Sequence, residues 1–495
     1  MKRSMKNYAY LFLAAVSVFS ACVKEVIPMP VPAQGNLTVF SDNFNLEALL
    51  YKMDPATGDT FMEAWCVEGL PGQPDSTCLP YLQRLGKDGK LKWNQWVPIT
   101  RKPGLLWVNE TVYDITTDGS VIDGVNVVDD NGLCQVFITK INPDGTYAWG
   151  NEGKLFYDFG ERAIYQVPCE SFVAADNEGG AWIAAGNGQE TLVFARVDSD
   201  GNFVVEPIVF SSRDGTGEDK EMLRRPQMFV GPDNSLIALI QYGNAIGGGG
   251  SSPILIDGYY DVVKIPADGN VEKITQNNLI SGSEIFNPGM RVTLTEDGKG
   301  GAYACFVYGV DVLHAYLYHF DSDANVDVKG VNLYPSGSWD VMLSLSAALD
   351  SKTNNLVILI HDSMADDYGR GYSVVNLQIA DLSGNLKYEE DGKNIFSTDP
   401  NDTMYAQIGY FTPATDGRFI FTFFVSKFRK STFLYQSRVD IGKEEIQDVE
   451  ELTEIDVPLS SFIDTESRMM VTDGVLRHLW FEEGKAIYGY DVKIK

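Results

Sequence analysis

A repeat of roughly 55 to 65 residues constrains this chain more than any other feature. Its first half is a turn that leads into a strand, as in 176–185 (DNEGGAWIAA) and 297–306 (DGKGGAYACF). Its second half is a strand that runs into an acidic glycine turn, as in 194–201 (FARVDSDG) and 138–145 (ITKINPDG). Looser copies of the first half begin at Asp54, Asp118, Asp233, Asp350, Asp416 and Asp473. Because one such unit cannot bury its apolar face alone, the copies must pack on one another.

The strands in each copy are short, rich in Val, Ile, Tyr and Phe, and bounded by Gly, Asp and Asn. Asp-Gly and Asn-Gly steps supply the positive φ values that tight hairpins need. No segment keeps a 3.6-residue periodicity over four turns, so we expect little helix. The pattern predicts an all-β fold, a single β-propeller of four-stranded blades.

The number of blades follows from the number of aspartate turns, which is eight. The last copy leaves no chain for a fourth strand, and the N-terminal stretch 36–40 (NLTVF) precedes the first complete unit. We therefore expect strands from the N- and C-terminal ends to share one blade and close the ring, which removes exposed sheet edges. Eight blades are favoured, with seven as the alternative.

Two copies carry a tryptophan shortly after the acidic turn, in 144–153 (DGTYAWGNEG) and 88–93 (DGKLKW). This pattern resembles quinoprotein-like (PQQ-type) propeller repeats, and most of residues 36–495 resemble propeller lipoproteins of the Bacteroidota-type cell envelope. Later copies lack the tryptophan and have Val204 and Tyr388 near the corresponding places. The resemblance implies a fold more than an activity. The adjacent cysteine pair that some quinone-dependent dehydrogenases carry is absent from this sequence.

The N-terminal segment indicates export. Basic residues precede an apolar run over 8–19, which ends in Ser20 and Ala21 before Cys22. This predicts a signal peptide over 1–21 and a lipid anchor on Cys22, in a segment that resembles the lipobox of bacterial lipoproteins; an ordinary secretory peptide is the alternative. Prolines at alternate positions make 22–35 a tether, which leaves 36–495 as the propeller domain. We expect an outer-membrane lipoprotein that faces the periplasm or the cell surface.

The formal net charge of −29 limits the partners. A field of this sign repels phosphate backbones and anionic lipid. We therefore expect no nucleic-acid partner, and contact with the membrane only through the lipid anchor. Partners that are neutral or cationic remain.

The remaining cysteines suggest one short disulfide loop. Cys66 and Cys78 flank a segment that must turn back on itself, so they are the favoured pair in an oxidising compartment. Cys134 with Cys169 is the other pairing considered. Cys305 lies in an apolar run and is expected in the core.

The sequence singles out no catalytic or metal-binding set. A glycosidase needs two carboxylates at a defined separation, and 68 acidic residues offer too many pairs to choose one. With only four histidines, no transition-metal site is predicted and no cofactor is expected. Calcium stays open, because 198–201 (DSDG) and 321–323 (DSD) place oxygens at alternate positions, although turn formation is the favoured role.

A binding surface is expected on the face of a propeller that carries its long loops. The long insertions are 65–78, 241–260 and 361–371, and the last two contain aromatic, amide and charged side chains. The candidate ligand-binding residues are Tyr242, Asn244, Tyr259, Tyr260, Asp366, Asp367, Tyr368 and Arg370. Their flat faces and polar tips suit a glycan or an envelope protein. We therefore favour a binding or scaffold module over an enzyme, and the alternative is a carbohydrate-active hydrolase or lyase on a propeller frame.

Overall fold

In the computed structural model, the first aspartate of a repeat closes a turn with its own side chain in every repeat where that aspartate is described. Asp176 Oδ1 accepts hydrogen bonds from the backbone N–H groups of Glu178 and Gly180, at 2.9 and 2.8 Å. Such turns reverse the chain, so the residues on either side pair as an antiparallel hairpin. The predicted aspartates that lie between the first two strands of a sheet are Asp54, Asp118, Asp176, Asp233 and Asp297. Asp350 is the last residue of the first strand of its sheet, and Asp416 and Asp473 lie outside the described residues.

The structure describes residues 36–41, 46–66, 79–102, 105–107, 111–128, 133–162, 170–187, 191–211, 221–246, 254–280, 292–309, 312–338, 343–350, 352–365, 371–397, 404–413, 418–427, 431–455, 470–472, 475–482 and 486–493. Within these ranges the chain forms 34 strands and one 3-10 helix, η1 (Val271–Lys273). In the described part of the chain, no helix is long and apolar enough to span a membrane. The expectation of an almost purely β protein is confirmed.

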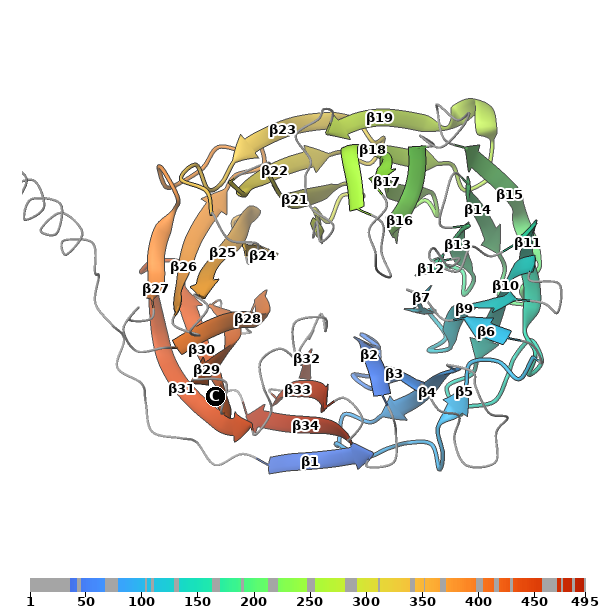
Figure 1. Cartoon of the computed structure of the whole chain (residues 1–495), viewed down its shortest axis with the longest axis horizontal. Coiled ribbons are helices and arrows are strands. Elements are labelled where there is room, and N and C mark those ends of the chain that lie inside the picture. Colours follow the sequence, from blue (N-terminus) through green and yellow to red (C-terminus); the bar gives the residue numbers. More distant parts are fainter. Residues whose placement is uncertain are drawn as a thin grey trace, which may run out of the picture.

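The described strands form eight sheets, six with four strands and two with five. The sheets stand around a common axis as the blades of a propeller (Figure 1). Blade 1 contains β2 (Leu46–Met53), β3 (Thr60–Cys66), β4 (Leu79–Leu85) and β5 (Val97–Pro98). Blade 2 contains β6 (Leu105–Trp107), β8 (Asp114–Ile115), β9 (Val121–Val128), β10 (Leu133–Ile141) and β11 (Lys154–Arg162). Blade 3 contains β7 (Thr111–Val112), β12 (Glu170–Ala175), β13 (Ala181–Gly186), β14 (Thr191–Val197) and β15 (Phe203–Ser211).

The next four blades have four strands each within the described residues. Blade 4 contains β16 (Glu221–Val230), β17 (Leu236–Ile246), β18 (Ile254–Ile265) and β19 (Thr275–Ile280). Blade 5 contains β20 (Val292–Glu296), β21 (Ala302–Tyr308), β22 (His314–Phe320) and β23 (Val326–Asn332). Blade 6 contains β24 (Ser344–Asp350), β25 (Asn355–Ala365), β26 (Gly371–Ala380) and β27 (Lys393–Ser397). Blade 7 contains β28 (Met404–Pro413), β29 (Phe419–Lys427), β30 (Ser431–Asp440) and β31 (Glu445–Ile455).

Blade 8 joins the two ends of the chain. It contains β32 (Met470–Thr472), β33 (Val475–Glu482), β34 (Ala486–Lys493) and, as its outer strand, β1 (Asn36–Ser41). The strand β1 pairs antiparallel with β34, from Asn36 opposite Asp491 to Ser41 opposite Ile487. The prediction that an N-terminal strand completes the last blade is therefore confirmed, and so is the favoured count of eight blades over seven.

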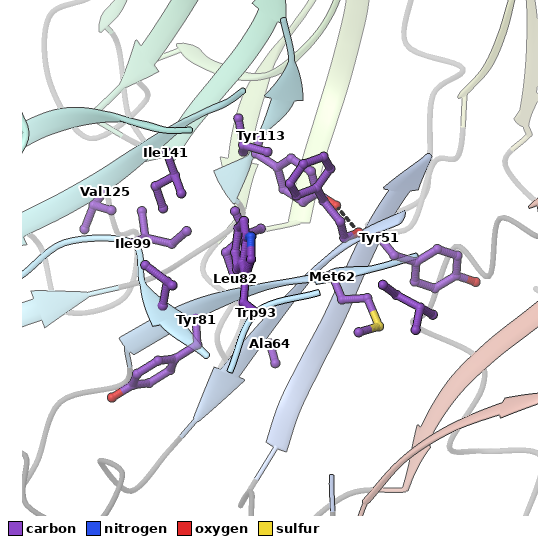
Figure 2. Close-up of a cluster of buried hydrophobic side chains, with 14 of the residues drawn as sticks. Tyr51, Met62, Ala64, Tyr81, Leu82, Trp93, Ile99, Tyr113, Val125 and Ile141 are labelled. Carbon is purple, nitrogen blue, oxygen red and sulfur yellow. Dashed lines mark hydrogen bonds between the residues drawn. The ribbon is translucent and has the colours of Figure 1, made fainter. Parts of the chain in front are cut away.

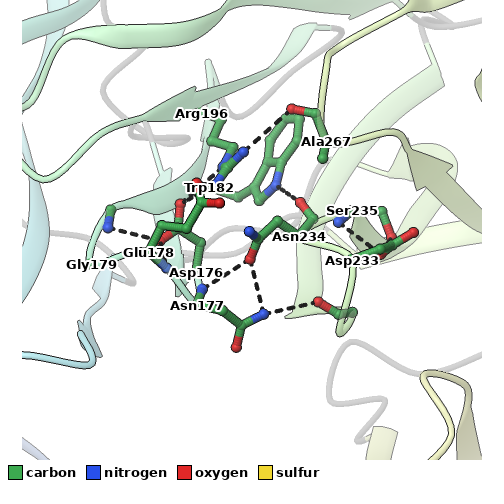
Figure 3. Close-up of polar contacts among 12 residues, drawn as sticks. Asp176, Asn177, Glu178, Gly179, Trp182, Arg196, Asp233, Asn234, Ser235 and Ala267 are labelled. Carbon is green, nitrogen blue, oxygen red and sulfur yellow. Dashed lines mark hydrogen bonds and ion pairs between the residues drawn. The ribbon is translucent and has the colours of Figure 1, made fainter.

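Polar contacts between neighbouring blades gather at the end of the sheets where the aspartate turns lie, which we call the turn face. In blade 3, Arg196 Nε donates to Asp176 Oδ2 at 2.9 Å, and its Nη1 reaches the carbonyl oxygen of Ala267 in blade 4. The Trp182 indole N–H donates to the carbonyl oxygen of Asn234, also in blade 4, at 2.9 Å. Figure 3 shows these contacts crossing from one turn to the next.

The same position of the third strand holds a basic residue in five successive blades. Each one bonds an aspartate of its own blade, and the first four also reach the next blade. These residues are Arg84, Lys140, Arg196, Lys264 and His319. Burial alone would raise the pKa of Asp118, the partner of Lys140, but hydrogen bonds from Thr116, Lys140 and Ser120 outweigh it and lower the pKa.

The tryptophans of the repeat pack on the next blade's turn. An ideal Cβ on Gly201, whose φ is +75°, would lie 2.8 Å from the Trp149 ring, so only glycine fits there. In the next copy Val205 takes the place of the tryptophan, because a Cβ on Gly269 would lie 2.3 Å from its Cγ1. The assignment of Val204 to this place is wrong by one residue: Val204 is 50% exposed, whereas Val205 is 4% exposed.

The hydrophobic core is divided among the seams between blades, where a seam means the packed interface of two neighbouring sheets. The seam of blades 1 and 2 buries Phe61, Leu82 and Trp93 against Val125 and Ile141 (Figure 2). Similar clusters fill the seams from blades 2 and 3 to blades 6 and 7. Strands buried on both faces explain why many of them read as continuous apolar runs.

The cysteines divide between core and disulfide. Cys305 is a free thiol, 1% exposed, as expected for a core residue, and burial raises its pKa to about 12. Cys134 is disulfide-bonded. Cys66 ends β3, but its side chain, Cys78, Cys169 and the anchor residue Cys22 also lie outside the described part, so the Cys66–Cys78 pairing stays a prediction.

Candidate functional site

The face opposite the turn face, here called the loop face, carries the connections between the second and third strands and between blades. This follows from the antiparallel order, because consecutive connections of a four-stranded meander alternate between the two ends of the sheet. The aspartate turns bond one another at the turn face. The predicted binding surface, on the long loops, therefore belongs to the loop face.

The ends of the outer strands define one level on the loop face in blades 4, 5 and 6. Tyr260 pairs with Ile280, the last residue of β19, and Tyr316 pairs with Asn332, the last residue of β23. In blade 6, Asp362 pairs with Val374, which in turn pairs with the last residue of β27. We call this level, with Tyr259, Tyr316 and Asp362 on it, the loop-face rim.

Two hairpins continue beyond the rim. The strands β17 and β18 pair as far as Ile246 and Ile254, and β25 and β26 pair as far as Ala365 and Gly371. The segments 241–260 and 361–371, expected as loops, are therefore mostly strand. The reason is that cross-strand pairing extends the hairpins past their outer strands, which the residue types do not reveal.

At the seam of blades 3 and 4, Tyr242 and Tyr259 stack with ring centroids 4.8 Å apart and an interplanar angle of 4°. The Gln276 side-chain amide donates to Tyr242 Oη at 3.1 Å and to Asp261 Oδ2 at 2.6 Å. Asn278 donates to the other carboxylate oxygen of Asp261. Tyr242 is 2% exposed, whereas Tyr259 is half-buried. The half-buried ring is thus held in place by a buried one.

The seam of blades 4 and 5 repeats this arrangement. Tyr308 and Tyr316 stack with centroids 4.3 Å apart and an interplanar angle of 20°. Tyr308 is buried and its hydroxyl lies 2.8 Å from that of Tyr318, while Tyr316 is half-buried. Two half-buried tyrosines, Tyr259 and Tyr316, therefore occupy neighbouring seams at the same level.

At the seam of blades 5 and 6 a buried carboxylate takes this place. Asp362 accepts hydrogen bonds from the hydroxyls of Tyr334, at 3.0 Å, and Ser338, at 2.6 Å. It is 4% exposed, and Asp261 is fully buried. Both carboxylates are thus hydrogen-bonded inside the protein.

The predicted site residues divide into three groups. Tyr242, Tyr259 and Tyr260 lie at the rim, with Tyr242 and Tyr260 buried in seams. Asn244 lies in β17 opposite Glu221 and Ile256, and its side chain is outside the described part. The others, Asp366, Asp367, Tyr368 and Arg370, lie outside the described residues altogether. The ligand-binding role of all of them stays a prediction.

Sequence reasoning missed Tyr316 and Asp362. The signal for Tyr316 was the alternation of aromatic residues in 314–320 (HAYLYHF), which places His314, Tyr316 and Tyr318 on one face of a strand. Asp362 had no such signal, because the hydroxyls that bond it belong to Tyr334 and Ser338, which lie in the connection between blades 5 and 6.

The acidic turns that left calcium open are occupied by their own backbone. Asp198 Oδ1 accepts from the N–H groups of Asp200 and Asn202, and Asp321 Oδ1 accepts from those of Asp323 and Asn325. Burial raises the pKa of Asp198, but the hydrogen bonds from Asn202 and Asp200 outweigh this and lower it. Among the described side chains, no three His, Cys, Asp or Glu residues gather as a metal site.

Comparisons with known proteins return structural likeness only. No protein-family model and no curated protein matches the chain. Among solved structures, it is similar to an ulvan lyase of polysaccharide lyase family PL25, with 12% identity, a TM-score of 0.43 and coverage of 92% of this chain and 95% of that one. An α-L-arabinanase of Penicillium chrysogenum gives 11% identity, a TM-score of 0.36 and coverage of 80% and 97%. The NanB sialidase of Streptococcus pneumoniae gives 11% identity, a TM-score of 0.37 and coverage of 94% and 71%. Values this low assign no function, and the propeller fold rests on the sheets themselves.

Proposed function

We propose that this chain is a lipid-anchored protein of the cell envelope that binds a neutral glycan through the loop-face rim of blades 4 to 6. The observation that carries the proposal is the pair of half-buried tyrosines, Tyr259 and Tyr316, each stacked on a buried tyrosine at neighbouring seams. Export and anchoring rest on the signal segment and Cys22.

Stacking prepares these rings for a ligand. A tyrosine that is already fixed loses little conformational entropy when a second flat surface covers it. The exposed part of its ring offers an apolar surface to the C–H groups of a sugar. The net charge of −29 disfavours acidic polysaccharides, so a neutral glycan fits better.

A glycan array tests the proposal. The chain from residue 36 onward is compared with Tyr259→Ala, Tyr316→Ala and the double variant. Because an aromatic contact contributes about 0.5–1.5 kcal/mol, each single variant should weaken binding up to roughly tenfold. The matched control is Phe203→Ala, which removes an aromatic ring that is 36% exposed on the outer strand β15.

Unchanged binding in the double variant would contradict the proposal that the glycan binds at Tyr259 and Tyr316. The same incubations report on the enzyme alternative, since a hydrolase or lyase would shorten the bound glycans and create new chain ends.

A further inference from the structure

A histidine lies beside one of the two tyrosines on which the proposed glycan site depends. His314 begins β22, pairs with Tyr308, and shares its face of the strand with Tyr316. The imidazole and the Tyr316 ring pack edge to face, with centroids 6.1 Å apart and an interplanar angle of 62°. Because Tyr316 lies at the loop-face rim, His314 lies two residues beyond the rim. The His314 side chain is half-buried, so part of it remains exposed to solvent.

The segment 333–338, which follows the last strand of blade 5, holds this imidazole in place. His314 Nδ1 lies 3.0 Å from the carbonyl oxygen of Tyr334. An ideal Cβ on Gly337, whose φ is +66°, would lie 2.7 Å from Cε1 and 2.9 Å from Nδ1 of the same ring. Only glycine permits both this backbone conformation and this close approach. The imidazole is therefore fixed on two sides, and it loses little conformational freedom when a ligand binds.

The hydrogen bond to Tyr334 also decides which nitrogen of the imidazole carries the hydrogen. A carbonyl oxygen can only accept, so Nδ1 is the donor. In the neutral ring, Nε2 then carries a lone pair and acts as an acceptor. Nε2 makes no hydrogen bond to any residue in the described part of the chain. With respect to these residues, His314 thus has an unused acceptor beside the Tyr316 ring.

A purely structural role would not require that second nitrogen. The bond to Tyr334 uses Nδ1 alone, and an asparagine amide could donate it as well. A sugar matches the pair of His314 and Tyr316, because it combines apolar C–H groups with hydroxyls that donate hydrogen bonds. A sugar that covers the exposed part of the Tyr316 ring would extend a hydroxyl past the edge of that ring, where His314 packs.

We propose that His314 Nε2 accepts a hydrogen bond from a hydroxyl of the glycan that covers Tyr316. This role rests on the proposed function and makes His314 a specificity-determining residue of the same site. Contact with the tyrosine ring contributes affinity for any sugar with an apolar face. The acceptor selects sugars that keep a free hydroxyl at this place, because an analogue without it leaves the nitrogen unpaired.

Two amide substitutions separate the roles of the two ring nitrogens. His314→Asn keeps an N–H donor near the position of Nδ1 for Tyr334 but removes the acceptor, whereas His314→Gln places an amide oxygen near the position of Nε2. The probes are mannan, xylan, galactan and β-glucan, each native and O-methylated, because an O-methyl group cannot donate a hydrogen bond. The wild type should prefer a native polysaccharide over its methylated form. We expect this preference to fall up to roughly tenfold in His314→Asn and to be largely retained in His314→Gln.

The variant Tyr316→Ala distinguishes a failure of this inference from a failure of the proposed function. If Tyr316→Ala weakens binding while His314→Asn keeps the wild-type preference, His314 is not the acceptor and the inference is overturned. A preference lost in His314→Gln but kept in His314→Asn would also overturn it, since only the bond to Tyr334 would then matter. A wild type that binds none of these polysaccharides would contradict the proposed function and the role of His314 together. Urea midpoints of unfolding show whether each variant is folded.

Discussion

At the scale of single residues, the repeat depends on glycines that touch the preceding blade. Gly201 needs its positive φ for the turn and its missing side chain for the Trp149 ring. Gly150 has a similar φ, +88°, but an added Cβ would meet nothing within 4 Å. Gly150 is therefore required only for its backbone conformation, whereas Gly201 is required both for its conformation and for the space that the Trp149 ring occupies.

Replacing each glycine by alanine should show this difference. Gly150→Ala should cost about 1 kcal/mol of unfolding free energy, from backbone strain alone. Gly201→Ala should cost about 2–4 kcal/mol, because the Trp149 ring must also move. Denaturant unfolding measures both, and equal costs would show that the ring does not limit this position.

At the scale of elements, basic residues of the third strands connect the turns of neighbouring blades. These ion pairs differ in how far their side chains are exposed to solvent. Arg196 and Asp176 are 6% and 1% exposed, so that pair is removed from water. Lys264 bonds Asp233 and Asp323, which are 63% and 70% exposed. Solvent therefore screens the ion pairs of Lys264, but not the ion pair of Arg196 with Asp176.

The two sets of ion pairs should respond differently to the loss of their cation. Arg196→Met leaves Asp176 buried without its counter-charge and should cost about 3–5 kcal/mol. Lys264→Met removes the equivalent residue of blade 4 and should cost no more than about 1 kcal/mol. Comparison of the urea midpoints of unfolding tests this. A similar loss of stability in both variants would mean that burial does not set the strength of these ion pairs.

At the scale of the whole molecule, blade 8 is assembled from segments far apart in the chain. Without β1, the strand β34 would present an open edge from Ile487 to Asp491. Open edges lower stability and invite pairing with other chains.

A chain that begins at residue 42 should therefore melt roughly 5 °C or more below one that begins at residue 36, and it should self-associate. The longer chain is the control, since it differs only by β1. Melting curves and light scattering give the readout. Two monomeric proteins with the same melting temperature would show that β1 is not needed to complete the ring.

Local chemistry made the architecture predictable. Asp176 and Asp297 bond their own turns, so the hairpins, and hence the number of blades, are written in contiguous residues. The shortage of chain after Asp473 indicated that an N-terminal strand must finish the ring. These inferences did not require knowing which faces of neighbouring blades pack against each other.

Tertiary packing decided the rest. Tyr242 and Tyr259 are both tyrosines of one hairpin, yet one is buried and the other half-buried, because burial depends on how blade 3 covers blade 4. Glu63 of β3 and Asp123 of β9 are ordinary acids in the sequence, and both are fully buried only because neighbouring sheets pack face to face. A repeat determines what each strand is, but only the ring determines which side chains of neighbouring strands become partners, since those contacts join residues that the local pattern treats as independent.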